Sequence, residues 1–145
     1  MRSDADAVVV GAGPAGATAA RELALRGVDT LLMERACLPR YKSCAGGIPV
    51  RTARALDFPI DDVIEDTVTG LRLTYRGRYG FTRWTEPPIA YMVMRDRFDH
   101  LLVQQAQAAG ARLADGVTLR GIERRREGFD LYTSAGPVRC RLLLG

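Results

Sequence analysis

The pattern of hydrophobic and polar residues divides the start of the chain into three elements. Residues 5–10 are apolar and β-branched and end at Gly11, which is typical of a buried parallel strand. Residues 14–26 are rich in Ala, Leu, Arg and Glu and stop before Gly27, as a helix with a glycine C-cap does. Residues 28–34 form a second apolar strand. The pattern therefore predicts a β-α-β unit with a right-handed crossover.

Beyond residue 66 the pattern changes from solid apolar runs to alternation. Apolar and polar side chains alternate in residues 71–76, a Gly-Arg turn follows, and residues 79–84 return, which predicts an antiparallel hairpin. A strand at 89–94 leads into a helix at 96–109. The last third predicts three short strands with glycine-bearing turns, at 117–122, 129–133 and 138–144. The expected fold class is α/β, with a parallel sheet, a small inserted antiparallel piece and a C-terminal β-meander.

The residues that join the first strand to the helix read Gly-Ala-Gly-Pro-Ala-Gly and fit the G-x-G-x-x-G motif. Gly11 permits a tight turn, Gly13 lets the backbone approach a pyrophosphate, and Gly16 lets the helix pack closely on the sheet. The helix N-terminus offers N–H groups and a partial positive charge to phosphates. Glu34, at the end of the second strand, is placed to accept hydrogen bonds from ribose hydroxyls and to repel a 2′-phosphate, which disfavours NADP. This complete context favours a dinucleotide site over a ligand-free strand-helix turn.

Composition limits the other chemistry that is available. A chain of 145 residues suits one domain with a real core, and no apolar run approaches the roughly 18 residues of a membrane span. The first six residues lack the apolar segment of a secretory signal, so we expect a cytoplasmic protein. Three cysteines without C-x-x-C spacing argue against a disulfide framework or a zinc ribbon. The single histidine, His100, argues against a Ser-His-Asp triad and against a metal site.

Charge adds one unusual residue. The net charge is +4, and among 21 basic residues Lys42 is the single lysine. The arginine run at 124–126 has two interpretations, an anion-binding patch or a solvated turn between two strands. Its neighbours Glu123, Glu127 and Gly128 favour the turn, so we do not expect nucleic-acid binding.

Three segments resemble known flavoproteins. The early glycine motif and the ending Met-Glu-Arg of the second strand resemble FAD-binding flavoproteins of the glutathione-reductase and p-hydroxybenzoate-hydroxylase type, although spacing alone leaves FAD and NAD open. Residues 38–48, Leu-Pro-Arg-Tyr-Lys-Ser-Cys-Ala-Gly-Gly-Ile, resemble the P-R-x-K-x-C-x-G-G loop of the geranylgeranyl reductase family, flavoenzymes that saturate isoprenoid double bonds. Residues 94–102 resemble the R-x-x-F-D-x-x-L helix start of that family, whose arginine corresponds to Arg95.

The resemblance implies a Rossmann-like FAD-binding fold with FAD as the cofactor. It implies an FAD-binding domain at 1–66 and 95–145, interrupted at 67–94 by the start of a substrate-domain antiparallel sheet. The family often has Cys-Gly-Gly-Gly where this chain has Cys-Ala-Gly-Gly, and the Asp-Gly motif of the family would follow Gly145, so we expect an N-terminal fragment. The residues expected to bind FAD are Gly11, Gly13, Pro14, Ala15, Gly16, Glu34, Arg35, Lys42, Ser43, Cys44, Ala45, Gly46 and Arg95.

The roles of several side chains remain open from the residues alone. Cys44, the candidate catalytic residue, has three interpretations: a polarizable wall of the flavin site, a proton donor, or buried filler. Lys42 and Arg40 either attract an anionic group, such as a prenyl diphosphate or the flavin phosphates, or are solvated loop cations. The aromatic residues of the hairpin either line an apolar substrate channel or pack against each other; they are Tyr75, Tyr79, Phe81 and Trp84.

The function that the resemblance implies is FAD-dependent reduction of carbon–carbon double bonds in isoprenoid chains. Such an enzyme needs an external electron donor, NAD(P)H or a reduced protein carrier, and a lipid-like substrate is compatible with peripheral contact to a membrane. Two alternatives remain: an aromatic-ring monooxygenase of the same fold, and a truncated, non-catalytic FAD-binding fragment. The loop that contains Lys42, Cys44 and two glycines favours the reductase.

Overall fold

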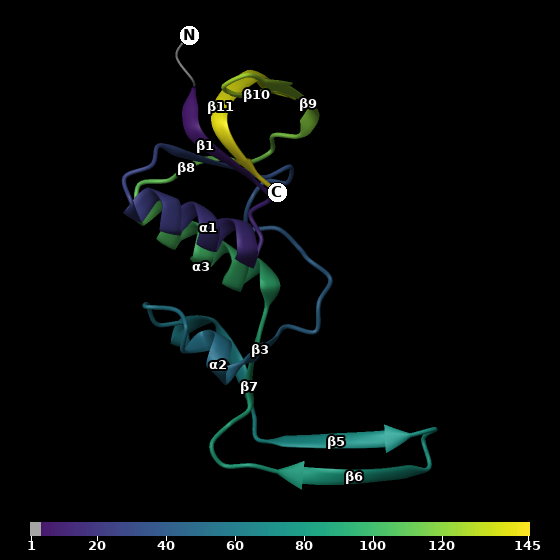
Figure 1. The fold of residues 1–145 in the computed structure, drawn as a ribbon. Coiled ribbons are helices and arrows are strands. Elements are labelled where there is room, and N and C mark those ends of the chain that lie inside the picture. The colour runs from purple at the N-terminus through teal and green to yellow at the C-terminus, as the bar shows by residue number, and fades with distance from the viewer. Residues whose placement is uncertain (1–3) are drawn as a thin grey trace. The chain divides into compact units, whose positions relative to one another are not determined.

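The computed structural model describes residues 4–145, which form two compact units (Figure 1). The first unit combines the N-terminal part of the chain, up to Arg40, with Asp99–Gly145. The second unit contains Tyr41–Phe98. The chain therefore leaves the first unit directly after Arg40 and returns to it near the start of a helix.

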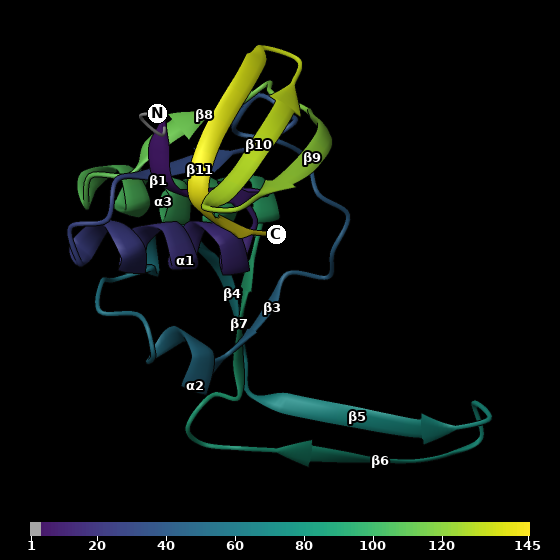
Figure 2. The same ribbon diagram turned by 45° about the horizontal axis from the view of Figure 1, so that its top comes forward.

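A six-stranded sheet forms the framework of the first unit, in the order β8-β2-β1-β11-β10-β9 (Figure 2). The strands are β1 (Ala5–Val10), β2 (Thr30–Met33), β8 (Arg112–Ala114), β9 (Leu119–Arg125), β10 (Gly128–Thr133) and β11 (Gly136–Leu144). The neighbours from β8 to β11 are parallel, whereas β11, β10 and β9 are antiparallel neighbours. The predicted parallel sheet and C-terminal β-meander are both confirmed.

Strand β1 lies inside this sheet and has a parallel partner on each side. Val8 is in register with Leu31 of β2 and with Leu143 of β11. Ala7, Val8 and Val9 are all buried, because both faces of the strand are covered. A strand of this kind needs apolar side chains on both faces, which explains why its sequence is a continuous apolar run and does not alternate.

Two helices, α1 (Pro14–Leu25) and α3 (Arg95–Ala108), cover one face of the sheet (Figures 1 and 2). The chain passes from β1 through α1 to β2, and later through α3 to β8 on the far side of β2. Right-handed crossovers that progress in one direction across a parallel sheet place their helices on the same face. Small side chains, Ala17, Ala20 and Ala106, are fully buried in this layer and allow the helices to approach the strands closely.

An apolar cluster joins the parallel strands to the meander. Its buried members come from β1, β2, β10 and β11, and they are Ala5, Val8, Met33, Leu131 and Cys140. Leu131 has no exposed surface, although its strand pairs with neither β1 nor β2. The cluster therefore ties the C-terminal strands to the first two strands through side-chain packing as well as through the β1–β11 ladder.

The second unit contains two small antiparallel sheets. One has the order β3-β7-β4, and its strands are β3 (Gly47–Pro49), β7 (Ala90–Val93) and β4 (Ile64–Val68). The other is the predicted hairpin, β5 (Gly70–Tyr75) and β6 (Tyr79–Trp84), in which Leu73 is in register with Phe81. A short helix, α2 (Val50–Ala53), and a 3-10 turn, η1 (Asp61–Val63), complete this unit. The aromatic side chains of the hairpin are exposed within the described chain.

Three strands were absent from the sequence-based expectations. β3 and β8 have three residues each, too few to show a period of two, and each depends on pairing with a strand that is distant in sequence. β4 contains Glu65 and Asp66, residues that are rare in strands, and both side chains are exposed. Tertiary pairing, which sequence patterns do not report, creates all three.

We expect the Leu131→Ala variant to lose about 2–5 kcal/mol of unfolding free energy, because it leaves a cavity in the apolar cluster. Leu142→Ala on the neighbouring strand β11 is the matched control, since Leu142 is 53% exposed and should change stability by no more than about 0.5 kcal/mol. Urea unfolding followed by circular dichroism measures both values. Similar losses in the two variants would contradict the assignment of Leu131 to the core.

Candidate functional site

The glycine motif forms the turn between β1 and α1. Gly11 has a φ of +103°, a conformation that favours glycine, and its N–H donates to the Met33 carbonyl at 2.7 Å. A Cβ placed on Gly16 would lie 1.9 Å from the Gly11 carbonyl oxygen. Gly16 must therefore be glycine for α1 to start where it does, which confirms the close-packing role expected from the motif.

Gly13 has a different environment. It is the N-cap residue of α1, and the helix has no side-chain cap and no acidic residue in its first turn. A Cβ placed on Gly13 would meet a single neighbour within 4 Å, an Arg40 nitrogen at 3.8 Å. The fold thus tolerates a small side chain here, and the first N–H groups of the helix have no competing side chain. This arrangement fits an anionic pyrophosphate that approaches the backbone at Gly13.

Glu34 lies at the end of β2 and connects to the same turn. Its Oε2 accepts the N–H of Ala12 at 2.9 Å, and its Oε1 accepts the N–H of Ala36 at 3.2 Å. The residue is 7% exposed. Burial raises the pKa of the Glu34 carboxyl, but the two N–H groups and the Arg40 guanidinium outweigh burial and hold the pKa below its ordinary value. Glu34 is therefore an ionised acceptor next to the glycine turn.

Two charged residues extend the surroundings of Glu34. Arg40 had two interpretations from the sequence, an anion-attracting cation or a solvated loop cation, and Asp99 was not among the expected site residues. Arg40 forms an ion pair with Glu34 at 3.4 Å, and it donates to Asp99 of α3 at 3.1 Å. Asp99 has no exposed surface. The signal in the sequence was the Phe-Asp pair of the predicted helix start, which places Asp99 on α3, but no local pattern indicates which cation it meets.

The remaining expected residues of the first unit lie around this turn. Pro14 occupies the first position of α1, where its fixed φ and missing N–H suit a helix start. Ala15 is exposed on the same turn of the helix, and the Arg35 side chain is exposed directly after Glu34. Their assignment as FAD-binding residues stays a prediction.

In the second unit the structure brings together Cys44, Gly46 and Arg95. The Gly46 N–H lies 3.5 Å from the Cys44 sulfur. This N–H, and then the Arg95 guanidinium, lower the pKa of the Cys44 thiol. Cys44 is exposed in the described chain, so the interpretation as buried filler is wrong. Cys140, by contrast, is buried in the core, and Cys37 is exposed.

The glycine after the Cys44 loop is required by packing. Gly46 has a φ of +77°, and a Cβ on it would lie 2.1 Å from the Val93 carbonyl oxygen of β7. The adjacent residues Lys42, Ser43 and Ala45 are exposed. Close backbone approach at Gly46 thus presents the loop residues 42–45 on the surface of this unit. A flavin-binding role for them stays a prediction.

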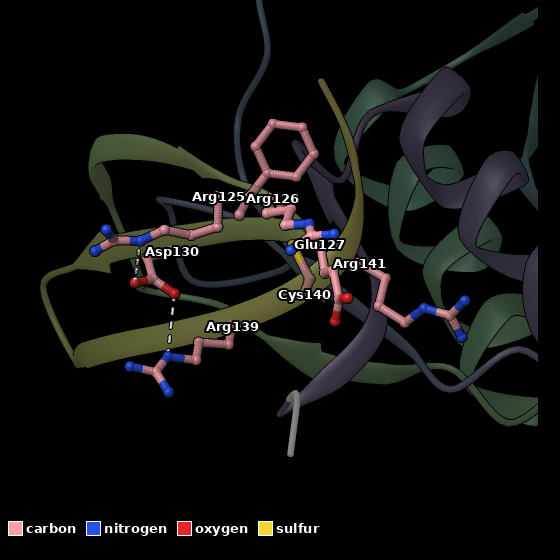
Figure 3. Close-up of a pocket in the computed structure, with 8 residues that line it drawn as sticks. Arg125, Arg126, Glu127, Asp130, Arg139, Cys140 and Arg141 are labelled. Carbon is pink, nitrogen blue, oxygen red and sulfur yellow. Dashed lines mark hydrogen bonds and ion pairs between the residues drawn. The ribbon is translucent and has the colours of Figure 1, made fainter. Parts of the chain in front are cut away.

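A separate hollow of about 570 Å³ lies at the meander and is surrounded by arginines (Figure 3). Two of its arginines are paired with one carboxylate: Asp130 pairs with Arg125 at 2.9 Å and with Arg139 at 3.0 Å. Arg125 also pairs with Glu123 at 2.8 Å. The arginine run therefore ends β9 and enters the turn to β10, as expected for a solvated turn, and the hollow shares no residue with the glycine motif.

Two further findings concern the described residues alone. Within residues 4–145, no group of three or more His, Cys, Asp or Glu side chains has a metal-binding arrangement. No helix in this part of the chain is long and apolar enough to cross a membrane. Among the described residues, the Nδ1 atom of His100 is buried and has no hydrogen-bond partner.

Comparison with known proteins agrees with a dinucleotide-binding fold. The sequence profile of one protein family, the FAD binding domain, matches residues 4–136. A geranylgeranyl diphosphate reductase from Rhodobacter capsulatus is 40% identical over 124 residues, 82% of this chain and 29% of the relative. A digeranylgeranylglycerophospholipid reductase from Methanothermobacter thermautotrophicus is 31% identical over 137 residues, 89% of this chain and 34% of the relative.

A solved structure agrees with these sequence matches. A geranylgeranyl bacteriochlorophyll reductase-like protein from Thermoplasma acidophilum, 26% identical, has a TM-score of 0.83 and covers 95% of this chain and 37% of its own. The chain thus spans about a third of the length of the proteins that it matches. The choice between FAD and NAD, which motif spacing left open, is resolved in favour of FAD.

The two glycines of the motif should respond differently to the same substitution. Gly16→Ala should lower thermal stability strongly, because its Cβ has no space beside the Gly11 carbonyl. Gly13→Ala should fold normally but bind FAD more weakly, and Gly13→Val should abolish tight binding, since the side chains lie where we expect the pyrophosphate. Melting temperature and FAD titration separate the two effects. Unchanged FAD affinity in Gly13→Val would refute the assignment.

Glu34→Gln should weaken FAD binding by about 1–3 kcal/mol through altered hydrogen bonds. It should also change how stability depends on pH. A carboxyl whose folded pKa is depressed contributes stability at neutral pH and loses that contribution as the pH falls through the folded pKa. Denaturant unfolding between pH 7 and pH 3 should therefore show a smaller loss for Glu34→Gln than for the wild type. Parallel pH profiles would contradict this expectation.

Proposed function

Because the chain belongs to the family of FAD binding domains, we propose that it serves an FAD-dependent oxidoreductase that reduces carbon–carbon double bonds of isoprenoid chains. The two reductases described above, which are named for geranylgeranyl and digeranylgeranyl compounds, support this substrate class. Residues in the first unit would hold the adenine end of FAD at the glycine turn and at Glu34. The loop with Cys44 in the second unit would supply the substrate side.

The observation that carries the proposal is the environment of Cys44. The thiol is exposed, accepts the Gly46 N–H and has its pKa lowered by that N–H and by Arg95. A cysteine with these neighbours transfers a proton more readily than an ordinary thiol. Together with the loop sequence, this supports the proton-donor interpretation of Cys44.

Saturation of an alkene adds two hydrogens with two electrons, one as hydride and one as a proton. FAD, when bound and reduced, supplies the hydride. In our proposal Cys44 donates the proton to the other alkene carbon, and Arg95 stabilises the thiolate that remains until solvent returns the proton. The two electrons come from an external donor, NAD(P)H or a reduced protein carrier.

The substrate in this proposal is a long apolar chain with an anionic headgroup. Lys42 is exposed two residues before Cys44, and no acidic residue occurs in residues 35–56. A prenyl diphosphate or phospholipid headgroup would be attracted to such a segment. An aromatic-ring monooxygenase does not require a proton donor of this kind, so the Cys44 environment favours the reductase.

Replacement of Cys44 tests the proposed chemistry in the full-length protein. Cys44→Ala should keep FAD bound, because the adenine end is held by the first unit, but should lower turnover of geranylgeranyl diphosphate per bound FAD by about 100-fold with dithionite as the reductant. The turnover that remains should also no longer show the change with pH that titration of the Cys44 thiol causes in the wild type.

Cys37→Ala is the matched control, since Cys37 is also an exposed thiol but lies in the first unit. It should leave turnover unchanged. If the Cys44→Ala variant turned over as fast per bound FAD as the wild type, the proton-donor proposal would be wrong. Absence of any alkene reduction by the wild type would end the assignment of the substrate class.

A further inference from the structure

Arg40 lies between two carboxylates that come from distant parts of the chain. Its Nε is 3.4 Å from Glu34 Oε2, and its Nη1 is 3.1 Å from Asp99 Oδ2. The side chain of Arg40 is 14% exposed, that of Glu34 is 8% exposed, and that of Asp99 is fully buried. All three residues belong to the first unit.

Each carboxylate has a separate structural connection. Glu34 accepts the N–H of Ala12 in the glycine turn, so its position and that of the turn are coupled. Asp99 is in the first turns of α3, which packs on the sheet and restricts its movement. The guanidinium therefore links the residue that contacts the glycine turn to a fixed point on a helix. A Cβ on Gly13 would lie 3.8 Å from Arg40 Nη2, so the same guanidinium borders the turn.

We propose that Arg40, anchored by Asp99, is a positioning residue for the dinucleotide site, which holds the Glu34 carboxylate ionised and oriented toward the ribose. In this proposal Arg40 affects nucleotide binding through Glu34, and Glu34 remains the residue that contacts the ribose. A planar guanidinium can donate to two carboxylates at once in a fixed geometry, which a lysine ammonium does less well. The inference concerns FAD binding and is independent of the substrate proposed above.

A purely structural role for the ion pairs predicts different behaviour. Breaking a buried ion pair destabilises the fold whatever the ligand, because a charge is left without a partner. A positioning role also predicts that the protonation of Glu34 shifts when Arg40 is removed. Burial would still raise the pKa of Glu34, while the attraction of Arg40 that opposes it would be gone. The pH dependence of nucleotide affinity distinguishes the two roles.

The charged groups near Glu34 come from three parts of the unit. Arg40 is on the segment after β2, and Asp99 on α3 contacts Arg40. Asp115 follows β8, where Ala114 accepts the backbone N–H of Glu34, and its carboxylate accepts the Leu38 N–H at 2.8 Å.

The experiment measures affinity for ADP, which contains the ribose and pyrophosphate without the flavin. Arg40→Gln should weaken ADP binding by about tenfold at pH 8, the loss expected when a charge-assisted contact no longer orients the acceptor. The ratio of wild-type to variant affinity should widen as the pH falls from 8 to 4, because Glu34 protonates earlier in the variant. Taking the ratio cancels the titration of the ADP phosphates.

Three further variants make the result decisive. Arg40→Lys should recover part of the affinity and most of the wild-type pH profile, because it restores the charge without the planar geometry. Asp99→Asn should weaken ADP binding in the wild-type background but have no further effect when combined with Arg40→Gln, since Asp99 acts through Arg40. Arg112→Gln is the matched control: Arg112 bridges to Asp29 on the surface and should leave ADP affinity unchanged.

Each outcome is informative, with the folded fraction of every variant checked by its melting curve. In one outcome, ADP affinity falls only in proportion to the folded fraction, and the ratio of wild-type to variant affinity does not depend on pH. Arg40 would then have a structural role alone, and the proposal would be overturned. Additive effects of Asp99→Asn and Arg40→Gln would overturn the role of Asp99 as the anchor. If Arg40→Gln does not fold, the ADP affinity and pH profile of Asp99→Asn and Arg40→Lys decide the question, and a wild-type profile in both would contradict the proposal.

Discussion

The hydrogen bond from the Ala12 N–H to the Glu34 carboxylate joins the two parts of the fold on which the proposed dinucleotide site depends. It connects the glycine turn after β1 with the end of β2, two segments that the parallel ladder already places side by side. Ala12 is fully buried, so without this acceptor its N–H would be an unsatisfied polar group. The carboxylate thus satisfies the backbone of the turn and remains ionised for a ligand.

The sheet topology explains why this contact occurs at all. Parallel strands have their carboxyl ends at one edge, and right-handed crossovers bring the helix N-terminus to that edge. The turn after β1 and Glu34 after β2 consequently meet, although Ala12 and Glu34 are 22 positions apart along the chain. Strand β11 adds a parallel neighbour on the other side of β1, and the meander closes the apolar cluster around Leu131. The site is therefore supported by the whole first unit.

In the proposed function, cofactor binding and chemistry would be divided between the two units of this chain. The dinucleotide features lie in the first unit, whereas Cys44, Gly46 and Arg95 form a cluster within the second. This division is physically reasonable, because a cofactor needs a rigid backbone cradle and a substrate needs an adaptable surface. The proteins that the chain matches are about three times longer, so further residues in such proteins are available to complete the substrate side.

The β-α-β unit, the hairpin, the meander and the dinucleotide motif were predictable from the sequence, because each depends on local periodicity or on glycines at fixed spacing. Gly11, Gly16 and Glu34 could be assigned in this way, since a strand-turn-helix context constrains them over a few residues. Tertiary structure alone decided the short strands β3 and β8, the exposure of Cys44 and the pairing of Arg40 with both Glu34 and Asp99. These features arise between residues that are distant in sequence, where contact depends on strand order and helix packing and leaves no periodic signal in the chain.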